Sequence, residues 1–410
     1  MDFSSKPVLT DTKDLPTTED FIMNDTIYPE SGSGSVSVYD FGVFPTMSTA
    51  DINRHLTRLN YEFTILMIPA MVFLLLLMVT GIVGNILVLH VYVSKCKFGT
   101  TRCYVLALAV CDLLSCCISM PGEIVDMTNN YTFTAAYLCK ILRSVNAFTT
   151  FSSGLILIAV AIDRYKKICT PCRIQFSVRT ANIVVIVCCI GSILLSLPAT
   201  VLYGKRTIST DIALVNGTDC STADAFIGTL YPLIYNGVQF LFFIFGSMVL
   251  ITLYSLIGKR IWRHQHFRDS GLNTGKKPVR ISSTTGSDGS SPVTEVVSAK
   301  SKRLSRMIST DTTHQDTLLS KSRRSGNRKT TLMLFLITVV FILSFLPHLI
   351  LMTLKALDKN SLSGSGGFAE LAHNILLRSY FINSATNPII YSFCSNKFRS
   401  ECQKLFKCKK

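Results

Sequence analysis

Residues 155–165, Leu-Ile-Leu-Ile-Ala-Val-Ala-Ile-Asp-Arg-Tyr, pass from eight apolar side chains directly into a charged tripeptide. These residues lie at the end of an apolar segment that spans 138–163. Similar segments run near 63–93, 101–126, 181–203, 228–258, 330–356 and 369–393. An α-helix needs roughly 20 apolar residues to cross a bilayer core about 30 Å thick. The pattern predicts an all-α membrane protein, a bundle of seven transmembrane helices.

The composition supports a membrane protein. Of 410 residues, 48% are hydrophobic and 16% charged, and the mean hydropathy is +0.39. Such a chain cannot hide its apolar surface in one soluble core. The second and seventh segments are interrupted by Asp112, Pro121, Asn383, Asn387 and Pro388. We expect these breaks to face the bundle interior, where neighbouring helices satisfy the freed backbone groups.

Lysine and arginine mark one side of the predicted bundle. Lys95, Lys97 and Arg102 follow the first segment, and further basic residues follow the third. The positive-inside rule places these connections in the cytoplasm, with the N-terminus extracellular and the C-terminus cytoplasmic. Most of the net charge of +16 then lies at the inner membrane surface. This favours anchoring in the plasma membrane over a nucleic-acid partner.

Glycosylation motifs and cysteines agree with this orientation. The Asn-x-Ser/Thr acceptors Asn24, Asn130 and Asn216 all lie in segments assigned to the outside. Of fourteen cysteines, Cys139 and Cys220 alone lie on that side. Because the outside is oxidising, we expect these two to form a disulfide, with two unpaired thiols as the alternative.

The chain divides into five regions. Residues 1–62 are expected to form an extracellular, disordered, glycosylated tail, and 63–258 the first five helices. Residues 259–329 form a basic, disordered cytoplasmic loop, 330–393 the last two helices, and 394–410 an amphipathic membrane-surface helix with the C-terminus. Serines after basic residues in the loop are candidate kinase sites that recruit an arrestin, unless the loop is a bare linker. Cys402 and Cys408 are candidate palmitoylation sites or unmodified thiols.

Motifs in all seven segments resemble those of the rhodopsin-like G-protein-coupled receptors, and the resemblance covers about 63–408. They are Gly84-Asn85, Leu108-Ala109-Val110-Cys111-Asp112, Asp163-Arg164-Tyr165, Pro198, Ser344-Phe345-Leu346-Pro347 and Asn387-Pro388-Ile389-Ile390-Tyr391, with Cys139, Tyr254, Phe341 and Phe398. The resemblance implies a receptor that activates a heterotrimeric G protein through a cytoplasmic cleft. It predicts no enzyme activity.

Two polar groups have roles that the resemblance implies. Asp112 is a carboxyl in the middle of the membrane, where an unpaired charge is unfavourable. With Ser153, Asn383, Ser384 and Asn387 it would form an allosteric sodium pocket, the alternative being a protonated carboxyl used in packing. Arg164 would be held by Asp163 at rest. On activation it would move toward Tyr254 and Tyr391.

The chain also departs from the family pattern. No carboxylate lies in 327–331 to pair with Arg164, so raised basal activity is a hypothesis. Phe345 replaces the sixth-helix tryptophan, Gly246 the fifth-helix proline, and Gly154 and Gly246 would leave space near the switch. Phe345 remains a bulky rotamer switch above Phe341, and Pro347 supplies a kink.

Exclusion narrows the ligand class. Asn146 replaces the aspartate that binds amines in related receptors, and Phe381 replaces the retinal-binding lysine. A peptide needs several polar anchors, and the outer half offers Glu123, Arg143, Asn146, Gln239, His348, Met352, Lys355 and His373. Plain helix packing or snorkelling at the lipid interface is the alternative role for each of these side chains. Glu123 would pair with a ligand arginine, as in RFamide peptides.

A peptide receptor has three alternatives. The same fold accepts small non-amine or lipid ligands. A transporter would show internal repeats and unwound half-helices, and no repeat is visible. A membrane enzyme would need a catalytic motif such as His-Glu-x-x-His, which the sequence lacks.

Overall fold

The computed structural model describes residues 47–96, 98–212, 215–273, 329–354 and 367–407. Within these residues six helices are long and apolar enough to cross a membrane. They are α1 (Thr49–Ser94), the stretch Thr100–Thr128, α4 (Ala136–Cys169), α5 (Val178–Leu202), α6 (Tyr231–Asn273) and the helix Lys329–Leu354. The second stretch comprises α2 (Thr100–Leu114), a π-helical turn (Ser115–Ser119) and α3 (Met120–Thr128).

The seventh predicted segment is a helix in three pieces. α8 (Gly367–Leu377) is followed by a 3-10 turn (Ser379–Phe381) and by α9 (Ile382–Cys394). Asn383, Asn387 and Pro388 lie inside α9 and are buried, which confirms that these interruptions of the apolar pattern face the bundle interior. At the break between α8 and α9, the carbonyl of Leu377 lies 2.7 Å from His348 Nδ1, so a freed backbone group finds a partner.

The first helix begins at Thr49, so the predicted disordered tail is wrong for residues 49–62. This outer extension contacts the neighbouring loops with one side. His55 Nε2 lies 2.9 Å from Asp211 Oδ1, and Asn60 Oδ1 accepts the Tyr131 backbone N–H at 2.8 Å. Similarly, α6 continues to Asn273, inside the region predicted as a disordered loop. Residues 274–328 lie outside the described part of the chain.

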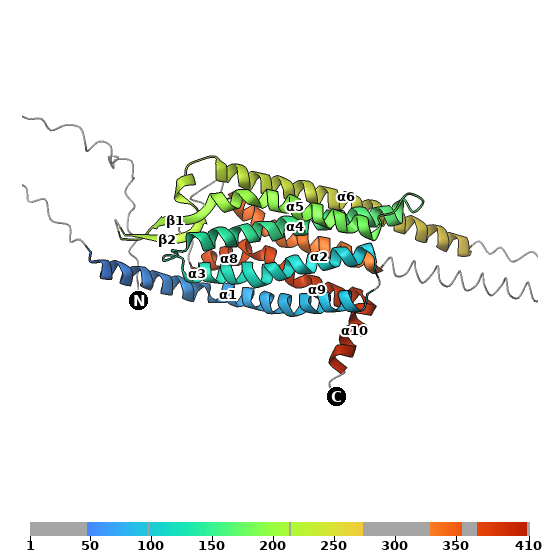
Figure 1. The fold of residues 1–410 in the computed structure, drawn as a ribbon, viewed down its shortest axis with the longest axis horizontal. Coiled ribbons are helices and arrows are strands. Elements are labelled where there is room, and N and C mark those ends of the chain that lie inside the picture. Colours follow the sequence, from blue (N-terminus) through green and yellow to red (C-terminus); the bar gives the residue numbers. More distant parts are fainter. Residues whose placement is uncertain (1–46, 97, 213–214, 274–328, 355–366, 408–410) are drawn as a thin grey trace, which may run out of the picture. The chain divides into compact units, whose positions relative to one another are not determined.

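A β-hairpin covers the end of the bundle at which α1 begins (Figure 1). β1 (Tyr203–Ser209) pairs antiparallel with β2 (Asn216–Thr222). The disulfide predicted between Cys139 and Cys220 is present, and it joins the start of α4 to β2. The Thr207 backbone N–H and hydroxyl both donate to Asp224, and these hydrogen bonds lower the pKa of the Asp224 carboxyl. The disulfide thus holds β2, and the hydrogen bonds to Asp224 hold β1.

α4 occupies the centre of the bundle. It packs against α2, α5 and α6, while α1 packs against α2 and α9. Glycine allows the closest approach between α1 and α9. A Cβ at Gly84 would lie 2.6 Å from the Pro388 side chain. Any larger residue at Gly84 would push apart the two helices that hold the polar centre of the bundle.

The predicted space beside Gly154 is filled. A Cβ at Gly154 would meet the Phe242 ring at 3.1 Å, and the Phe242 and Phe151 rings pack edge to face with centroids 5.0 Å apart. At Gly246 the nearest atom to an added Cβ is Ile158 Cδ1 at 3.5 Å. The Phe242 ring of α6 therefore fills the space that a larger side chain at Gly154 of α4 would occupy.

Candidate ligand cavity and cytoplasmic switch

A cavity of about 690 Å³ opens between α4, α6, the 329–354 helix and the hairpin. Six of the eight predicted ligand residues line it: Glu123, Arg143, Asn146, Gln239, His348 and Met352. His373 is not among the lining residues, and Lys355 lies outside the described residues. The cavity is also lined by Tyr203, Arg206, Arg378 and Tyr380, which were not predicted. Burial raises the pKa of the Tyr203 phenol, so it is a neutral group there.

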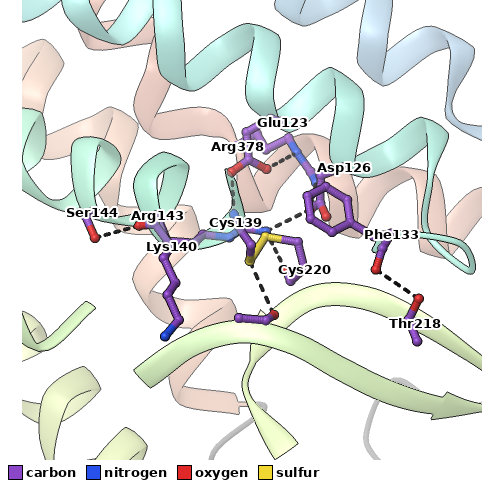
Figure 2. Close-up of a disulfide and its surroundings, with 11 residues drawn as sticks. Glu123, Asp126, Phe133, Cys139, Lys140, Arg143, Ser144, Thr218, Cys220 and Arg378 are labelled. Atoms are coloured by element: carbon purple, nitrogen blue, oxygen red, sulfur yellow. Dashed lines mark hydrogen bonds and ion pairs between the residues drawn. A yellow bond between two sulfur atoms is a disulfide. The ribbon is translucent and has the colours of Figure 1, made fainter. Parts of the chain in front are cut away.

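Four charged side chains form an ion cluster beside the disulfide (Figure 2). Glu123 Oε1 lies 2.5 Å from Arg143 Nη1, and Glu123 Oε2 lies 2.9 Å from Arg378 Nε. Asp126 Oδ2 accepts from Arg143 Nη2 at 2.8 Å. Arg143 Nη2 also donates to the Cys220 carbonyl at 3.0 Å. The cluster joins α3, α4, β2 and the break before α9, and its two acids balance its two bases.

The predicted pairing of Glu123 with a ligand arginine does not fit this arrangement. Both Glu123 oxygens already bind guanidinium groups, and the residue is 7% exposed. A ligand arginine would have to displace Arg143 or Arg378. Arg378 was missed, although it is the single lysine or arginine of the predicted segment 369–393. A buried charge in a spanning helix needs a partner, and that rule would have found it.

His348, Asn146 and Tyr380 form a second polar group in the cavity wall. The Leu377 carbonyl can only accept, so His348 Nδ1 carries the proton and Nε2 of the neutral ring is an acceptor. Asn146 Nδ2 donates to the Tyr380 hydroxyl at 2.7 Å. Asn146 Oδ1 is buried and accepts no hydrogen bond from any described residue.

Aromatic rings form the deep end of the cavity. Phe345 contacts Phe341, Phe243 and Tyr380 with ring centroids 4.8, 6.0 and 5.5 Å apart. Pro347 follows Phe345 by two residues, inside the continuous 329–354 helix. A ligand that displaced Tyr380 or Phe345 would therefore move the predicted rotamer switch directly.

Buried oxygens surround Asp112 deeper in the bundle. Asn387 Nδ2 donates to Asp112 Oδ2 at 2.8 Å, and the Ser384 hydroxyl lies beside the same carboxyl. Asp112 Oδ1, Asn383 Oδ1 and Asn387 Oδ1 are buried without a hydrogen-bond donor among the described residues. Ser153 is also buried. Such oxygens are the ligands that hard cations prefer, so the residues fit the predicted sodium pocket.

The tripeptide Asp163-Arg164-Tyr165 is held by contacts with α2 and with its own helix. Arg164 binds Asp163 and donates to Thr101 Oγ1 at 3.0 Å, and Lys167 Nζ lies 2.9 Å from Asp163 Oδ2. Thr101 belongs to α2 and Lys167 to α4. In the described part of the chain, Arg164 makes no hydrogen bond to the 329–354 helix. The next tripeptide residue, Tyr165, is partly buried.

Two tyrosines predicted to meet Arg164 on activation are buried. The Tyr254 ring contacts Phe335 of the 329–354 helix with centroids 5.4 Å apart. Tyr391 packs against Tyr92 and Phe398. Neither hydroxyl has a hydrogen bond to Arg164 in the described residues. Among the described residues, the hydrogen bonds of Arg164 therefore reach α2 and its own helix and not the two tyrosines.

The predicted modification sites are only partly described. Asn216 is exposed at the start of β2, and Asn130 is partly buried in the loop after α3. Cys402 lies in α10 (Asn396–Lys407) and is partly buried. Asn24 and Cys408 lie outside the described residues.

Comparison with known proteins gives the family. Residues 84–391 match the family described as 7 transmembrane receptor (rhodopsin family). The chain is 26% identical to neuromedin-U receptor 2 of Rattus norvegicus over 342 residues, 82% of this chain and 74% of that protein. It is 27% identical to the Mus musculus receptor, with the same shares, and 26% identical to the Homo sapiens receptor, with 82% and 71%. The chain therefore belongs to the rhodopsin family of seven-transmembrane receptors.

Proposed function

We propose that this receptor binds an extracellular neuropeptide of the neuromedin-U type and activates a heterotrimeric G protein. The observation that supports a peptide ligand is the cavity. It combines a polar rim on the hairpin with a charged wall and an aromatic floor, so it offers several anchors of different chemistry. The relatives named above are neuromedin-U receptors, which supports the same ligand class here.

The observation that supports a G-protein partner is the arrangement of Arg164 at the cytoplasmic end. Release of Arg164 from Asp163 and Thr101 frees a guanidinium fork beside Tyr254 and the 329–354 helix. A partner helix can then enter the groove opened by movement of that helix. The N-terminus faces outward in the plasma membrane, and α10 lies along the inner membrane surface, anchored by Phe398 against Tyr391. Membrane lipid, kinases and an arrestin act on the cytoplasmic segments.

Nucleotide exchange tests the proposal. Membranes containing the receptor are treated with a set of synthetic neuropeptides that includes neuromedin U, and exchange on added G proteins is measured. A peptide should raise exchange in the wild type and not in Arg164→Ala. A response to small non-amine or lipid compounds without a response to any peptide would favour a receptor of the same fold for such ligands. The aromatic floor of the cavity suits that alternative.

Sodium should lower basal exchange. Sodium bound by Asp112 and the free oxygens of Asn383 and Asn387 ties the second helix to α9 in the resting arrangement. Replacing sodium with N-methyl-D-glucamine at equal ionic strength should raise basal exchange about fivefold or more. Asp112→Asn should lose this response. Equal exchange in both salts in the wild type would argue that the carboxyl serves only in packing.

Basal signalling should exceed that of mock-transfected cells. The hydrogen bonds of Arg164 reach α2 and its own helix, so in the described residues they do not restrain the 329–354 helix. A ligand-free receptor then samples the open cleft more often. The readout is exchange without ligand, normalised to surface receptor, with Arg164→Ala as the silent control. Wild-type signalling equal to mock would show that packing alone holds the resting state.

A further inference from the structure

Two acceptor motifs for N-linked oligosaccharides lie side by side at the hairpin end of the bundle. One is Asn130-Tyr131-Thr132, in the loop after α3, and the other is Asn216-Gly217-Thr218, at the start of β2. Thr132 and Thr218 form a parallel β-bridge, in which the Thr218 N–H donates to the Tyr131 carbonyl at 2.8 Å. The two motifs have the same chemistry, but their surroundings differ.

The threonine of the first motif is bound by α1. Asn60 Nδ2 donates to Thr132 Oγ1 at 2.5 Å, and Asn60 Oδ1 accepts the Tyr131 N–H at 2.8 Å. The Tyr131 ring also packs edge to face on Phe63, with ring centroids 6.5 Å apart. The hydroxyl that completes the motif therefore joins α1 to the loop after α3, a role that needs no oligosaccharide.

Asn130 lies close to the ends of two spanning helices. It follows Thr128, the last residue of α3, by two positions, and α4 begins six positions later at Ala136. Tyr137, in the first turn of α4, is 83% exposed, which suits an aromatic side chain at the membrane surface. An extended chain spans at most about 3.3–3.6 Å per residue, so Asn130 stays within roughly 7 Å of the end of α3 even before the loop folds.

Asn216 has a much longer reach. It lies fourteen residues after Leu202, where α5 ends, and fifteen before Tyr231, where α6 begins. Before the hairpin forms, this chain can extend roughly 45 Å from the helix ends. In the folded receptor Asn216 is exposed at the first position of β2, whereas Asn130 is partly buried.

We propose that Asn216 carries an N-linked oligosaccharide and that Asn130 remains unmodified; this rests on the outward orientation proposed above. The donor is a lipid-linked oligosaccharide diphosphate. Asn216 Nδ2 bonds to the first sugar and loses a proton, while the bond between that sugar and the lipid diphosphate breaks. The transferase active site lies above the membrane surface, where Asn216 reaches it and Asn130 does not. After folding, the hydrogen bonds to Asn60 prevent the first motif from extending into an active site.

Enzymatic removal of N-linked oligosaccharides tests which acceptor is used. The full-length receptor is produced in animal cells, and its electrophoretic mobility is compared before and after treatment. Asn24, outside the described residues, is replaced by Gln in a second series so that each shift has one source. In that series Asn216→Gln should abolish the shift, and Asn130→Gln should leave it unchanged. Peptide mass spectrometry locates the site, because the release converts a modified Asn to Asp.

An insertion separates reach from local sequence. About a dozen Gly and Ser residues on each side of Asn130-Tyr131-Thr132 give that motif a reach similar to that of Asn216. In the Asn24→Gln/Asn216→Gln background this insertion should create a new shift, and Thr132→Ala should remove it again. An inserted loop without a shift would overturn the explanation by distance from the membrane.

Thermal unfolding in detergent tests the role of the Thr132 hydroxyl. Thr132→Ala should lower the midpoint by about 2 °C or more, because Asn60 loses an acceptor, and should leave glycosylation unchanged. Thr132→Ser and Asn130→Gln keep the hydroxyl, so both should match the wild type. The double variant Asn60→Ala/Thr132→Ala should be about as stable as Asn60→Ala alone, since both remove the same contact. A wild-type midpoint in Thr132→Ala would overturn this role.

The possible glycosylation results are distinct. An oligosaccharide on Asn130 of the wild type would overturn the proposal. An unmodified Asn216 in a receptor whose Asn24 is modified would overturn it as well. If none of the three acceptors is modified, the outward orientation itself fails.

Discussion

Glu123→Gln is expected to destabilise the receptor by about 3–5 kcal/mol, because it leaves two buried arginines with one carboxylate. The Glu123 side chain is 8% exposed and the Arg378 side chain 6%, so water replaces little of the lost interaction. The glutamine amide keeps one acceptor oxygen, so either Arg143 Nη1 or Arg378 Nε loses its acceptor. Asp126, 4.0 Å from Arg378 Nη2, cannot balance both cations.

Thermal unfolding in detergent measures this effect. The buried thiols Cys111 and Cys116 become reactive on unfolding, so a thiol-reactive dye reports the midpoint. The midpoint should fall by roughly 5 °C or more. Arg378→Gln alone should also lower it. The double variant should recover part of the loss, because it removes one acid together with one base.

The same experiment separates a structural role from ligand binding. A Glu123→Gln receptor with wild-type thermal stability and reduced potency only for arginine-containing peptides would show that Glu123 binds ligand. Loss of stability without that peptide selectivity assigns Glu123 to the ion cluster.

Hydropathy located the helices well but misplaced their ends. The segment 138–163 became α4, because apolar residues of sufficient length leave few alternatives in a membrane. The outer extension of α1 was missed because Thr49–Glu62 is polar in composition. Its helix is supported by contacts with distant residues such as Asp211 and Tyr131. Such contacts have no signature in a local window.

The sequence predicted which residues line the site. It did not predict which of these residues pair with each other. Polar residues in the outer halves of the segments were correctly expected to gather, and six of them line one cavity. Which acid meets which base depends on the break after Leu377, which places Arg378 beside Glu123. The break itself lacks a proline or glycine. The space beside Gly154 was likewise misjudged, since Phe242 lies far along the chain.

Removing the disulfide is expected to abolish the peptide response. Cys139 and Cys220 are 81 residues apart, and loss of a link over such a loop costs about 2–5 kcal/mol. The effect on the cavity is expected to be larger than the effect on overall stability. β2 contributes Ser221 and Thr222 to the cavity, and the Cys220 carbonyl accepts from Arg143. Without the link, the hairpin and the Arg143 side chain lose their fixed positions together.

The double variant Cys139→Ser/Cys220→Ser tests this, because it leaves no unpaired thiol at the site. Peptide potency should fall by at least about a hundredfold, while surface expression falls less, since the helices remain inserted. Cys172→Ser, at an exposed free cysteine, is the matched control and should behave as the wild type. Full potency in the double variant would mean that the remaining ties, Arg143 to the Cys220 carbonyl and Thr218 to Phe133, hold the hairpin on their own.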